Sequence, residues 1–256
     1  MSLFLFSCEK GKTNDKNLSK NDTLNTQEAH TLANNHVYVQ NFDKLVTEFE
    51  STEREDWKQR EKIFQKISPI EGATIVDIGA GTGFFTFALA EKAKKVLALD
   101  IDKRFIDFIK NKRKTLPENQ QKKIETRLIS PEDPRLTDNE ADVAMLVNVY
   151  HHISSRLVYL KKIRNGLQKE GKILIIEFKK GDMGIDFGPP ENMKLDVKTI
   201  TNELEKANFE NIEVDIETLK YQVVITSKRK NKAVLVSILI KLKYFCKIKI
   251  VLLCLW

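Results

Sequence analysis

The feature that most constrains the fold is a regular alternation of short apolar runs with segments of helical periodicity. The apolar runs have the length and composition of strands, and they cover residues 73–78, 96–99, 124–129, 142–149, 172–178, 212–218 and 221–226. Helical spacing predicts two helices within residues 42–67 and further helices over 84–95, 103–114, 154–167 and 196–207. Strands that are apolar along their whole length belong in a parallel sheet covered on both faces. The sequence therefore predicts a doubly wound α/β domain.

The last two runs are too close together for a crossover connection and should form an antiparallel hairpin. The predicted fold class is thus α/β, Rossmann-like and doubly wound, with a mostly parallel seven-stranded sheet and an antiparallel C-terminal hairpin. Ligands of such sheets bind beyond the carboxyl ends of the strands. The loops to examine are those after Ile78, Asp100, Ile129, Val149 and Phe178.

The first of these loops carries glycines at every second position, in the stretch Val76-Asp-Ile-Gly-Ala-Gly-Thr-Gly-Phe-Phe85. Glycines let a ligand approach the backbone closely, and the N-terminus of the following helix favours a negative group. The dinucleotide pattern G-x-G-x-x-G fails, because a third glycine counted from Gly79 falls at Phe84. This argues against a nicotinamide-dependent oxidoreductase.

The residues instead match D-x-G-x-G-x-G, from Asp77 to Gly83, with Asp100 closing the second strand. This arrangement resembles the class I S-adenosylmethionine-dependent methyltransferases, and the similarity runs from about Tyr38 to Ser227. The segments NVYHHI and LKKIRNGLQKEGKILIIEFKKG are similar to the small-molecule, type 11 branch of that family. Lys169-Glu170-Gly171 stands where that branch often has Pro-Gly-Gly. The resemblance implies S-adenosyl-L-methionine as the cofactor and a small-molecule methyl acceptor.

The resemblance also implies roles for individual residues. The acid after the second strand accepts hydrogen bonds from both ribose hydroxyls, the first acid helps to hold the ammonium end, and an acid after the third strand lies near the adenine amine. Carried over to this sequence, the cofactor-binding residues are Asp77, Gly79, Ala80, Gly81, Gly83, Asp100, Ile101, Asp133 and Asn148. Glu132 is the alternative to Asp133.

A general base is needed only if the acceptor carries a proton that must leave. The candidates follow the fourth strand and are Tyr150, His151 and His152, although at least one histidine is equally compatible with a packed structural role. No metal site is predicted, since the cysteines, at positions 8, 246 and 254, all lie in terminal segments.

Residues 37–69 should form a helical cap, in which Arg54 could meet the cofactor carboxylate and Trp57 could line the pocket, or both could belong to an ordinary helix face. The methyltransferase domain itself should cover residues 70–227. Lys179–Pro190 is a long loop at the ligand edge of the sheet and a candidate acceptor lid.

Residues 1–36 have the composition of a disordered leader. Cys8 follows a short apolar run, which indicates either a truncated lipoprotein signal or an accidental cysteine. Residues 228–256 alternate apolar and basic side chains, as a strand or membrane-surface segment does, but an extension outside the fold is favoured. Cys8 lipidation or this basic tail could associate with a membrane; a cytoplasmic location is favoured over a membrane-anchored lipoprotein.

The net charge of +7 comes from the tail, because residues 228–256 contain eight basic residues and no acid. Residues 37–227 carry a net charge of −1, so no nucleic-acid partner is expected. The sequence therefore favours a methyltransferase with a small-molecule acceptor. The alternatives are a non-catalytic, membrane-tethered binding module on the same fold and, less favoured, a nicotinamide-dependent oxidoreductase.

Overall fold

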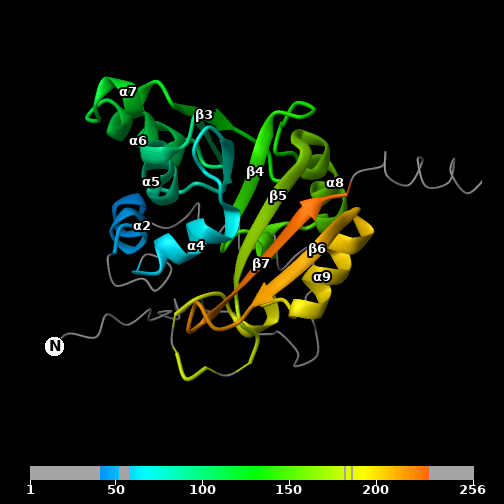
Figure 1. Cartoon of the computed structure of the whole chain (residues 1–256). Coiled ribbons are helices and arrows are strands. Elements are labelled where there is room, and N and C mark those ends of the chain that lie inside the picture. Colours follow the sequence, from blue (N-terminus) through cyan, green and yellow to red (C-terminus); the bar gives the residue numbers. More distant parts are fainter. Residues whose placement is uncertain (1–40, 52–57, 182, 186, 231–256) are drawn as a thin grey trace, which may run out of the picture.

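A seven-stranded sheet in the order β3-β2-β1-β4-β5-β7-β6 forms the centre of the computed structural model, which describes residues 41–51, 58–181, 183–185 and 187–230 (Figure 1). β1 to β5 are parallel neighbours, whereas β7 is antiparallel to both β5 and β6. The predicted fold class, including the antiparallel C-terminal hairpin, is confirmed. The strands are β1 Thr74–Ile78, β2 Lys95–Asp100, β3 Ile124–Leu128, β4 Ala141–Val147, β5 Leu167–Phe178, β6 Phe209–Asp215 and β7 Gln222–Arg229.

Helices cover both faces of the sheet because the strands are apolar on both sides. Ile75 of β1 packs in one hydrophobic cluster with α4 and α5, and the next residue, Val76, packs in a second cluster with α8 and α9. The helices are α2 Phe42–Phe49, α4 Arg60–Ile67, α5 Phe84–Lys92, α6 Lys103–Arg113, α7 Glu118–Gln121, α8 Arg156–Gly166 and α9 Val197–Lys206, with short 3-10 turns η1 Tyr150–His152 and η2 Glu191–Met193.

Several boundaries differ from the prediction. α8 begins at Arg156 rather than at residue 154, with Ser155 at the N-cap, and the Ser155 side chain makes no capping hydrogen bond. β6 begins at Phe209 rather than residue 212, because its register with β7 shifts between Glu210 and Glu213. The short α7 was not predicted.

The C-terminal boundary also lies later than expected. β7 continues past Ser227 to Arg229, whose guanidinium donates hydrogen bonds to the Leu167 carbonyl and to Asn139 Oδ1. Arg164 of α8 donates to the carbonyl of Lys230 at 3.1 Å. The first residues assigned to the tail therefore belong to the fold, while residues 231–256 lie outside the described residues, as does the leader with Cys8.

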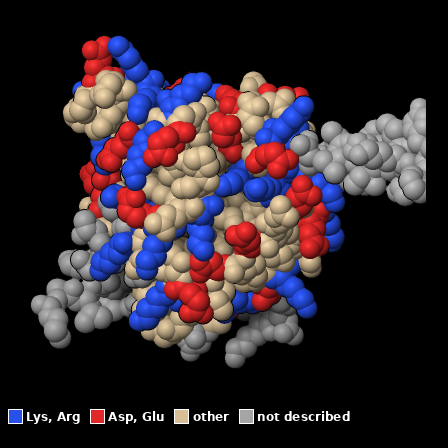
Figure 2. Space-filling view, in the orientation of Figure 1, with Lys and Arg blue, Asp and Glu red and all other residues tan. Residues whose placement is uncertain are grey.

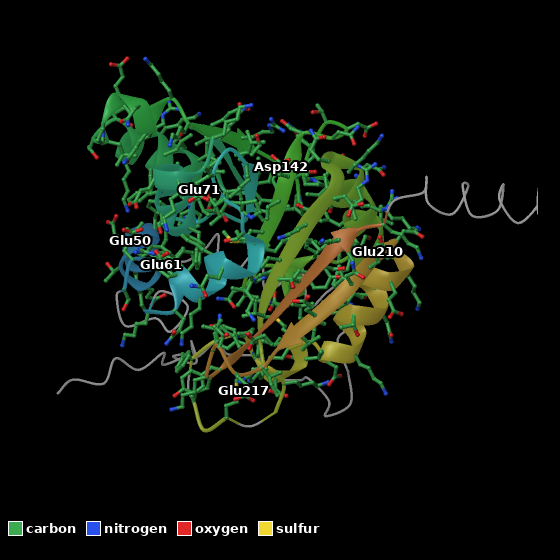
Figure 3. All side chains as sticks on the ribbon, viewed as in Figure 1. Glu50, Glu61, Glu71, Asp142, Glu210 and Glu217 are labelled. Carbon is green, nitrogen blue, oxygen red and sulfur yellow. The ribbon has the colours of Figure 1, made fainter. Side chains whose placement is uncertain are left out.

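Lys179, directly after β5, holds the connection between β6 and β7. Its Nζ donates hydrogen bonds to the carbonyl oxygens of Ile216, Leu219 and Lys220 at 2.7, 2.9 and 2.9 Å. Glu217, labelled in Figure 3, lies in the same connection. Three carbonyl dipoles on one ammonium group fix the turn against the end of β5.

Replacing this ammonium group should therefore destabilise the fold. We expect Lys179→Met to lower the free energy of unfolding by about 2 kcal/mol, since hydrogen bonds to a charged group are each worth roughly 1.5–3 kcal/mol and are not additive. Urea denaturation of the full chain measures this. Lys180→Met, which removes an exposed ion pair with Asp196, is the matched control and should change stability little. Equal effects of the two substitutions would contradict the assignment.

Candidate active site

The glycine loop is held by the end of the neighbouring strand β2. The carbonyl oxygen of Leu99 accepts hydrogen bonds from the backbone N–H groups of both Gly79 and Ala80, at 2.7 and 3.0 Å. Gly83 then adopts a left-handed conformation, with φ of 80°, at the N-cap of α5. The loop thus presents backbone at a helix N-terminus, at the carboxyl edge of the parallel strands.

Gly79 shows why this position needs a glycine. Its φ is 72°, and a Cβ at this position would overlap the side chain of Val149, which follows β4. The loop therefore passes the end of β4 at a separation that only a bare backbone allows.

Asp100, at the end of β2, faces the glycine loop and is 6% exposed. Its Oδ2 accepts a hydrogen bond from the Gly81 N–H at 2.8 Å, and its Oδ1 accepts one from the Asp102 N–H at 2.9 Å. Burial raises the pKa of Asp100 to about 6, against the opposing effect of these two donors. The structure thus brings this acid and the glycine loop together, as the sequence predicts.

Asp77 is a second buried acid behind the loop. Its Oδ2 accepts a hydrogen bond from the Thr86 hydroxyl of α5 at 2.6 Å. Burial, together with the negative charge of Asp100, raises the pKa of Asp77 to about 6 against the opposing effect of the Thr86 hydrogen bond. Two carboxyl groups with raised pKa values at one strand edge are typical of a functional site, here one suited to a cationic ligand.

The other predicted cofactor residues lie in varied surroundings. Asp133 is half-exposed and binds the Lys162 ammonium at 2.9 Å and the Arg135 N–H at 2.8 Å, which together lower its pKa. Ile101 packs against the second hydrophobic cluster. Asn148 has a φ of 57°, and its Oδ1 accepts a hydrogen bond from Gln222 Nε2 at 2.8 Å.

Of the three candidate bases after β4, Tyr150 is separated from the two histidines. The Tyr150 side chain is fully buried in the cluster beneath α8 and α9, and its hydroxyl donates to Glu203 Oε2 at 2.6 Å. Burial, followed by this hydrogen bond, raises the pKa of Tyr150 above its ordinary value, which makes it unsuited to accept a proton. The prediction of Tyr150 as a catalytic residue therefore has no support in this geometry.

His151 lies instead against β5. Its Nδ1 is 2.7 Å from Oε2 of Glu177, and its ring centroid is 4.2 Å from that of His152. Sequence reasoning missed Glu177 and also Gln222. A signal for Glu177 was present, because it is a single acid inside the apolar run of β5.

Helix α2 covers part of the glycine loop. A Cβ added to Gly81 would lie 3.2 Å from the Phe49 ring. That ring also stacks on Phe105 of α6, with the two ring centroids 5.4 Å apart. Glu50, labelled in Figure 3, pairs with Lys112 of α6 at 2.6 Å. The predicted helical cap thus includes a helix that lies over the site, although Arg54 and Trp57 lie outside the described residues.

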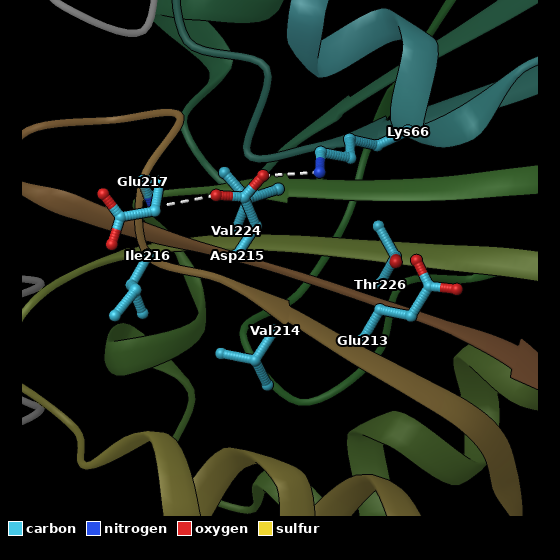
Figure 4. Close-up of a pocket in the computed structure, with 8 residues that line it drawn as sticks. All are labelled: Lys66, Glu213, Val214, Asp215, Ile216, Glu217, Val224 and Thr226. Atoms are coloured by element: carbon cyan, nitrogen blue, oxygen red, sulfur yellow. Dashed lines mark hydrogen bonds and ion pairs between the residues drawn. The ribbon is translucent and has the colours of Figure 1, made fainter.

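A hollow lined by Lys66, Glu213, Val214, Asp215, Ile216, Glu217, Val224 and Thr226 lies on β6 and β7 (Figure 4). Lys66 and Asp215 pair across it at 2.5 Å. Three strands, β4, β5 and β7, separate β6 from β1 and its glycine loop. This hollow is therefore distinct from the candidate active site.

The described part of the chain contains neither a candidate metal site nor a candidate membrane-spanning helix. No group of three or more His, Cys, Asp or Glu side chains there could hold a metal ion. Within the same ranges, no helix has both the length and the apolar character needed to span a membrane.

The fold and the glycine loop define an α/β domain built for a nucleoside-containing cofactor, and comparisons with known proteins agree. A methyltransferase domain model of the type 11 family matches residues 76–175. The tRNA U34 carboxymethyltransferase of Haemophilus influenzae is 28% identical over 179 residues, which are 64% of this chain and 54% of the relative. The ribosomal RNA small subunit methyltransferase A of Mycoplasmopsis synoviae is 34% identical over 109 residues, covering 42% and 39% of the two chains. The chain spans about half the length, or less, of these curated relatives.

Solved structures show the same fold. An S-adenosylmethionine-dependent methyltransferase from Aquifex aeolicus superimposes with a TM-score of 0.64 at 23% identity, over 74% of this chain and 99% of its own. A type 11 methyltransferase from Sulfolobus solfataricus gives a TM-score of 0.56 at 24% identity, over 71% and 95%. Residues 76–175 therefore match the type 11 methyltransferase family, the fold is that of class I S-adenosylmethionine-dependent methyltransferases, and S-adenosylmethionine is the cofactor that this match implies.

The geometry at Gly79 generates a stability prediction. We expect Gly79→Ala to destabilise the protein by about 3 kcal/mol, because left-handed strain of roughly 1–2 kcal/mol adds to overlap with Val149. Gly72→Ala is the matched control: its φ is 77°, but nothing lies within 4 Å of the added Cβ. Thermal or urea unfolding measures both. If Gly72→Ala costs as much as Gly79→Ala, the loop does not pass Val149 closely.

The raised pKa of Asp77 predicts a pH-dependent effect on stability. A folded-state pKa of about 6 lies above the ordinary pKa of 3.8 for an aspartate, so this group's contribution to stability falls as the pH rises from about 4 to 6 and stays low above that. The free energy of unfolding of Asp77→Asn, relative to that of the wild type, should therefore be about 1.5 kcal/mol higher at pH 8 than at pH 5.

Urea unfolding at the two pH values measures this difference. Asp107→Asn on the surface of α6 is the control. The Lys103 ammonium lowers the pKa of Asp107, so this carboxyl is ionised in both the folded and the unfolded state from pH 5 to pH 8, and its substitution should give a difference that does not depend on pH. A pH-independent difference for Asp77→Asn would show that its carboxyl has an ordinary pKa.

Proposed function

We propose that this methyltransferase acts on a small-molecule acceptor, with the cofactor held between the glycine loop and Asp100. Asp100 would accept hydrogen bonds from the ribose hydroxyls in addition to those it accepts from backbone N–H groups, because a carboxylate has about four acceptor lone pairs. Asp77, behind the loop, would supply negative charge for the ammonium end. When bound, the cofactor supplies an electrophilic methyl group, so the protein's main task is to align the acceptor.

The observation that supports a small acceptor best is the cover formed by α2. The Phe49 ring lies over Gly81. The rings of Phe42 and Phe49 both pack on Phe105 of α6, with centroid distances of 5.1 and 5.4 Å. At the end of β5, Phe187 packs on Tyr221 at 5.2 Å, so part of the predicted lid loop also folds back on the sheet edge. Covers on two sides favour a compact acceptor over a polymer.

The charge distribution supports the same conclusion. Residues 37–227 carry a net charge of −1. On the face shown in Figure 2, Lys and Arg are interspersed with Asp and Glu rather than gathered into a basic patch. Binding to a nucleic-acid backbone depends on such a patch.

An RNA acceptor is the second candidate, because the relative from Haemophilus influenzae is named a tRNA carboxymethyltransferase and the one from Mycoplasmopsis synoviae a ribosomal RNA methyltransferase. Both alignments leave much of those relatives unmatched. Release of S-adenosylhomocysteine in the presence of total tRNA, of ribosomal RNA and of a small-molecule library would distinguish the two candidates. Turnover with RNA alone would overturn the small-molecule proposal.

The cofactor site is tested by calorimetric titration of the full chain. We expect S-adenosylmethionine and S-adenosylhomocysteine to bind and NADH not to bind. Asp100→Ala should weaken both adenosyl ligands by about 100-fold, corresponding to the loss of two hydrogen bonds to a carboxylate at roughly 1.5 kcal/mol each.

The control is Asp107→Ala on α6, which removes an exposed carboxylate and should bind like the wild type. Circular dichroism of Asp100→Ala must match the wild type, because this substitution also removes acceptors from two backbone N–H groups. Unchanged affinity in a folded Asp100→Ala would overturn the assignment of the ribose site.

A further inference from the structure

Glu177 is the most deeply buried acid in the described part of the chain, with 1% of its surface exposed. It lies at the next-to-last position of β5, a strand that is otherwise apolar toward this end. Burying a carboxylate is costly unless charge or hydrogen bonds compensate it. Such a residue in the centre of a sheet therefore requires an explanation beyond packing.

Both oxygens of Glu177 are bound by one residue. Oε1 accepts a hydrogen bond from the backbone N–H of His151 at 3.2 Å, and Oε2 lies 2.7 Å from His151 Nδ1. A carboxylate at this distance places the ring proton on Nδ1 and leaves Nε2 as the lone-pair nitrogen. The two contacts together fix the orientation of the imidazole, which is itself 3% exposed.

The pair lies at the cofactor edge of the sheet. His151 is two residues after Val149, whose side chain lies against Gly79 of the glycine loop. Asn148, three residues before His151, is fixed by Gln222 of β7 at 2.8 Å. His151 is therefore held by Glu177 of β5. The residues shortly before it in the chain, Asn148 and Val149, contact Gln222 of β7 and Gly79 of the glycine loop.

The remaining charged groups near the pair are already engaged. Arg156 of α8 binds Glu203 of α9 at 3.0 Å, and Glu203 also accepts the Tyr150 hydroxyl. His152 stacks on His151 from the same turn. Glu177 is thus the one acid that contacts the His151 ring among the described residues. A buried polar pair of this kind contributes little to stability compared with an apolar pair of the same shape, so stability alone does not account for it.

We propose, resting on the function proposed above, that Glu177 is a positioning residue that holds His151 as the proton acceptor, and that the methyl acceptor attacks through a hydroxyl oxygen. Near neutral pH an amine has a minor neutral fraction with a free lone pair and a thiol a minor thiolate fraction, both without any base in the protein, whereas a hydroxyl group is a weak nucleophile until its proton is removed. This defines the acceptor class as an alcohol or a phenol.

The step balances as follows. The hydroxyl oxygen forms a bond to the methyl carbon, the bond from sulfur to that carbon breaks, and its electron pair stays on sulfur. The hydroxyl proton passes to His151 Nε2. The Nδ1 proton remains in its hydrogen bond to Glu177, which stabilises the imidazolium ion.

The test uses the full chain with S-adenosylmethionine and three small probes: catechol for hydroxyl acceptors, benzylamine for amines and thiophenol for thiols. Release of S-adenosylhomocysteine is measured from pH 6 to pH 9. We expect turnover with catechol and a rate that rises with pH. Glu177→Gln keeps an acceptor for the His151 N–H but removes the negative charge. It should lower kcat 10- to 100-fold and move the rising limb of the pH–rate profile to lower pH. Its affinity for S-adenosylmethionine should be unchanged.

Glu125→Gln on β3, which removes a half-exposed carboxylate paired with Lys95, is the matched control and should leave kcat and the pH profile unchanged. If Glu177→Gln does not fold, His151→Asn keeps a donor toward Glu177 but lacks the base, and should lose turnover while binding the cofactor. A purely structural role would alter stability without moving the pH profile.

The outcomes separate the two proposals. A chain that fails to bind S-adenosylmethionine overturns the proposed cofactor site itself. A chain that binds it but methylates only benzylamine or thiophenol, or none of the three probes, overturns the hydroxyl assignment. An unchanged kcat in Glu177→Gln overturns the role of Glu177.

Discussion

The site depends on the hydrogen bonds that the end of β2 makes to the loop after β1. The Leu99 carbonyl accepts two consecutive N–H groups of that loop, and the next residue, Asp100, accepts a third from Gly81. These contacts hold a glycine-rich turn in a conformation that other residues rarely adopt. The parallel pairing of β1 with β2 supplies the alignment, because Ile78 and Leu99 are direct partners. The register of β1 with β2 therefore also determines the conformation of the glycine loop.

Asp77, Asp100 and Glu177, three of the buried acids at this edge, differ in their environments. Asp77 and Asp100 accept hydrogen bonds from neutral donors, and burial raises the pKa of each to about 6. Glu177 instead faces an imidazole at 2.7 Å. The first two suit a ligand that brings positive charge and hydroxyl donors, whereas the third suits a proton that arrives during the reaction. The differing partners assign separate tasks to chemically similar side chains.

The order of strands and helices and the position of the glycine loop could be predicted because apolar periodicity and glycine spacing are local properties. The direction of individual side chains could not. Tyr150 and His151 are adjacent in one 3-10 turn, yet Tyr150 binds Glu203 of α9 and His151 binds Glu177 of β5. Only tertiary packing decides which helix or strand each meets. The start of β6 was missed for a similar reason, since its shift in register exists only in the pairing with β7.

The antiparallel direction of β7 has a practical consequence. Because β7 runs against β1 to β5, Arg229 and Lys230 lie at the edge of the sheet opposite the glycine loop, where Arg164 and the Leu167 carbonyl hold them. A dye, an affinity handle or an immobilising surface attached just after Lys230 would therefore leave from the far side of the sheet. A shortened chain used for such work should retain Lys230, whose carbonyl oxygen completes the contacts of Arg164.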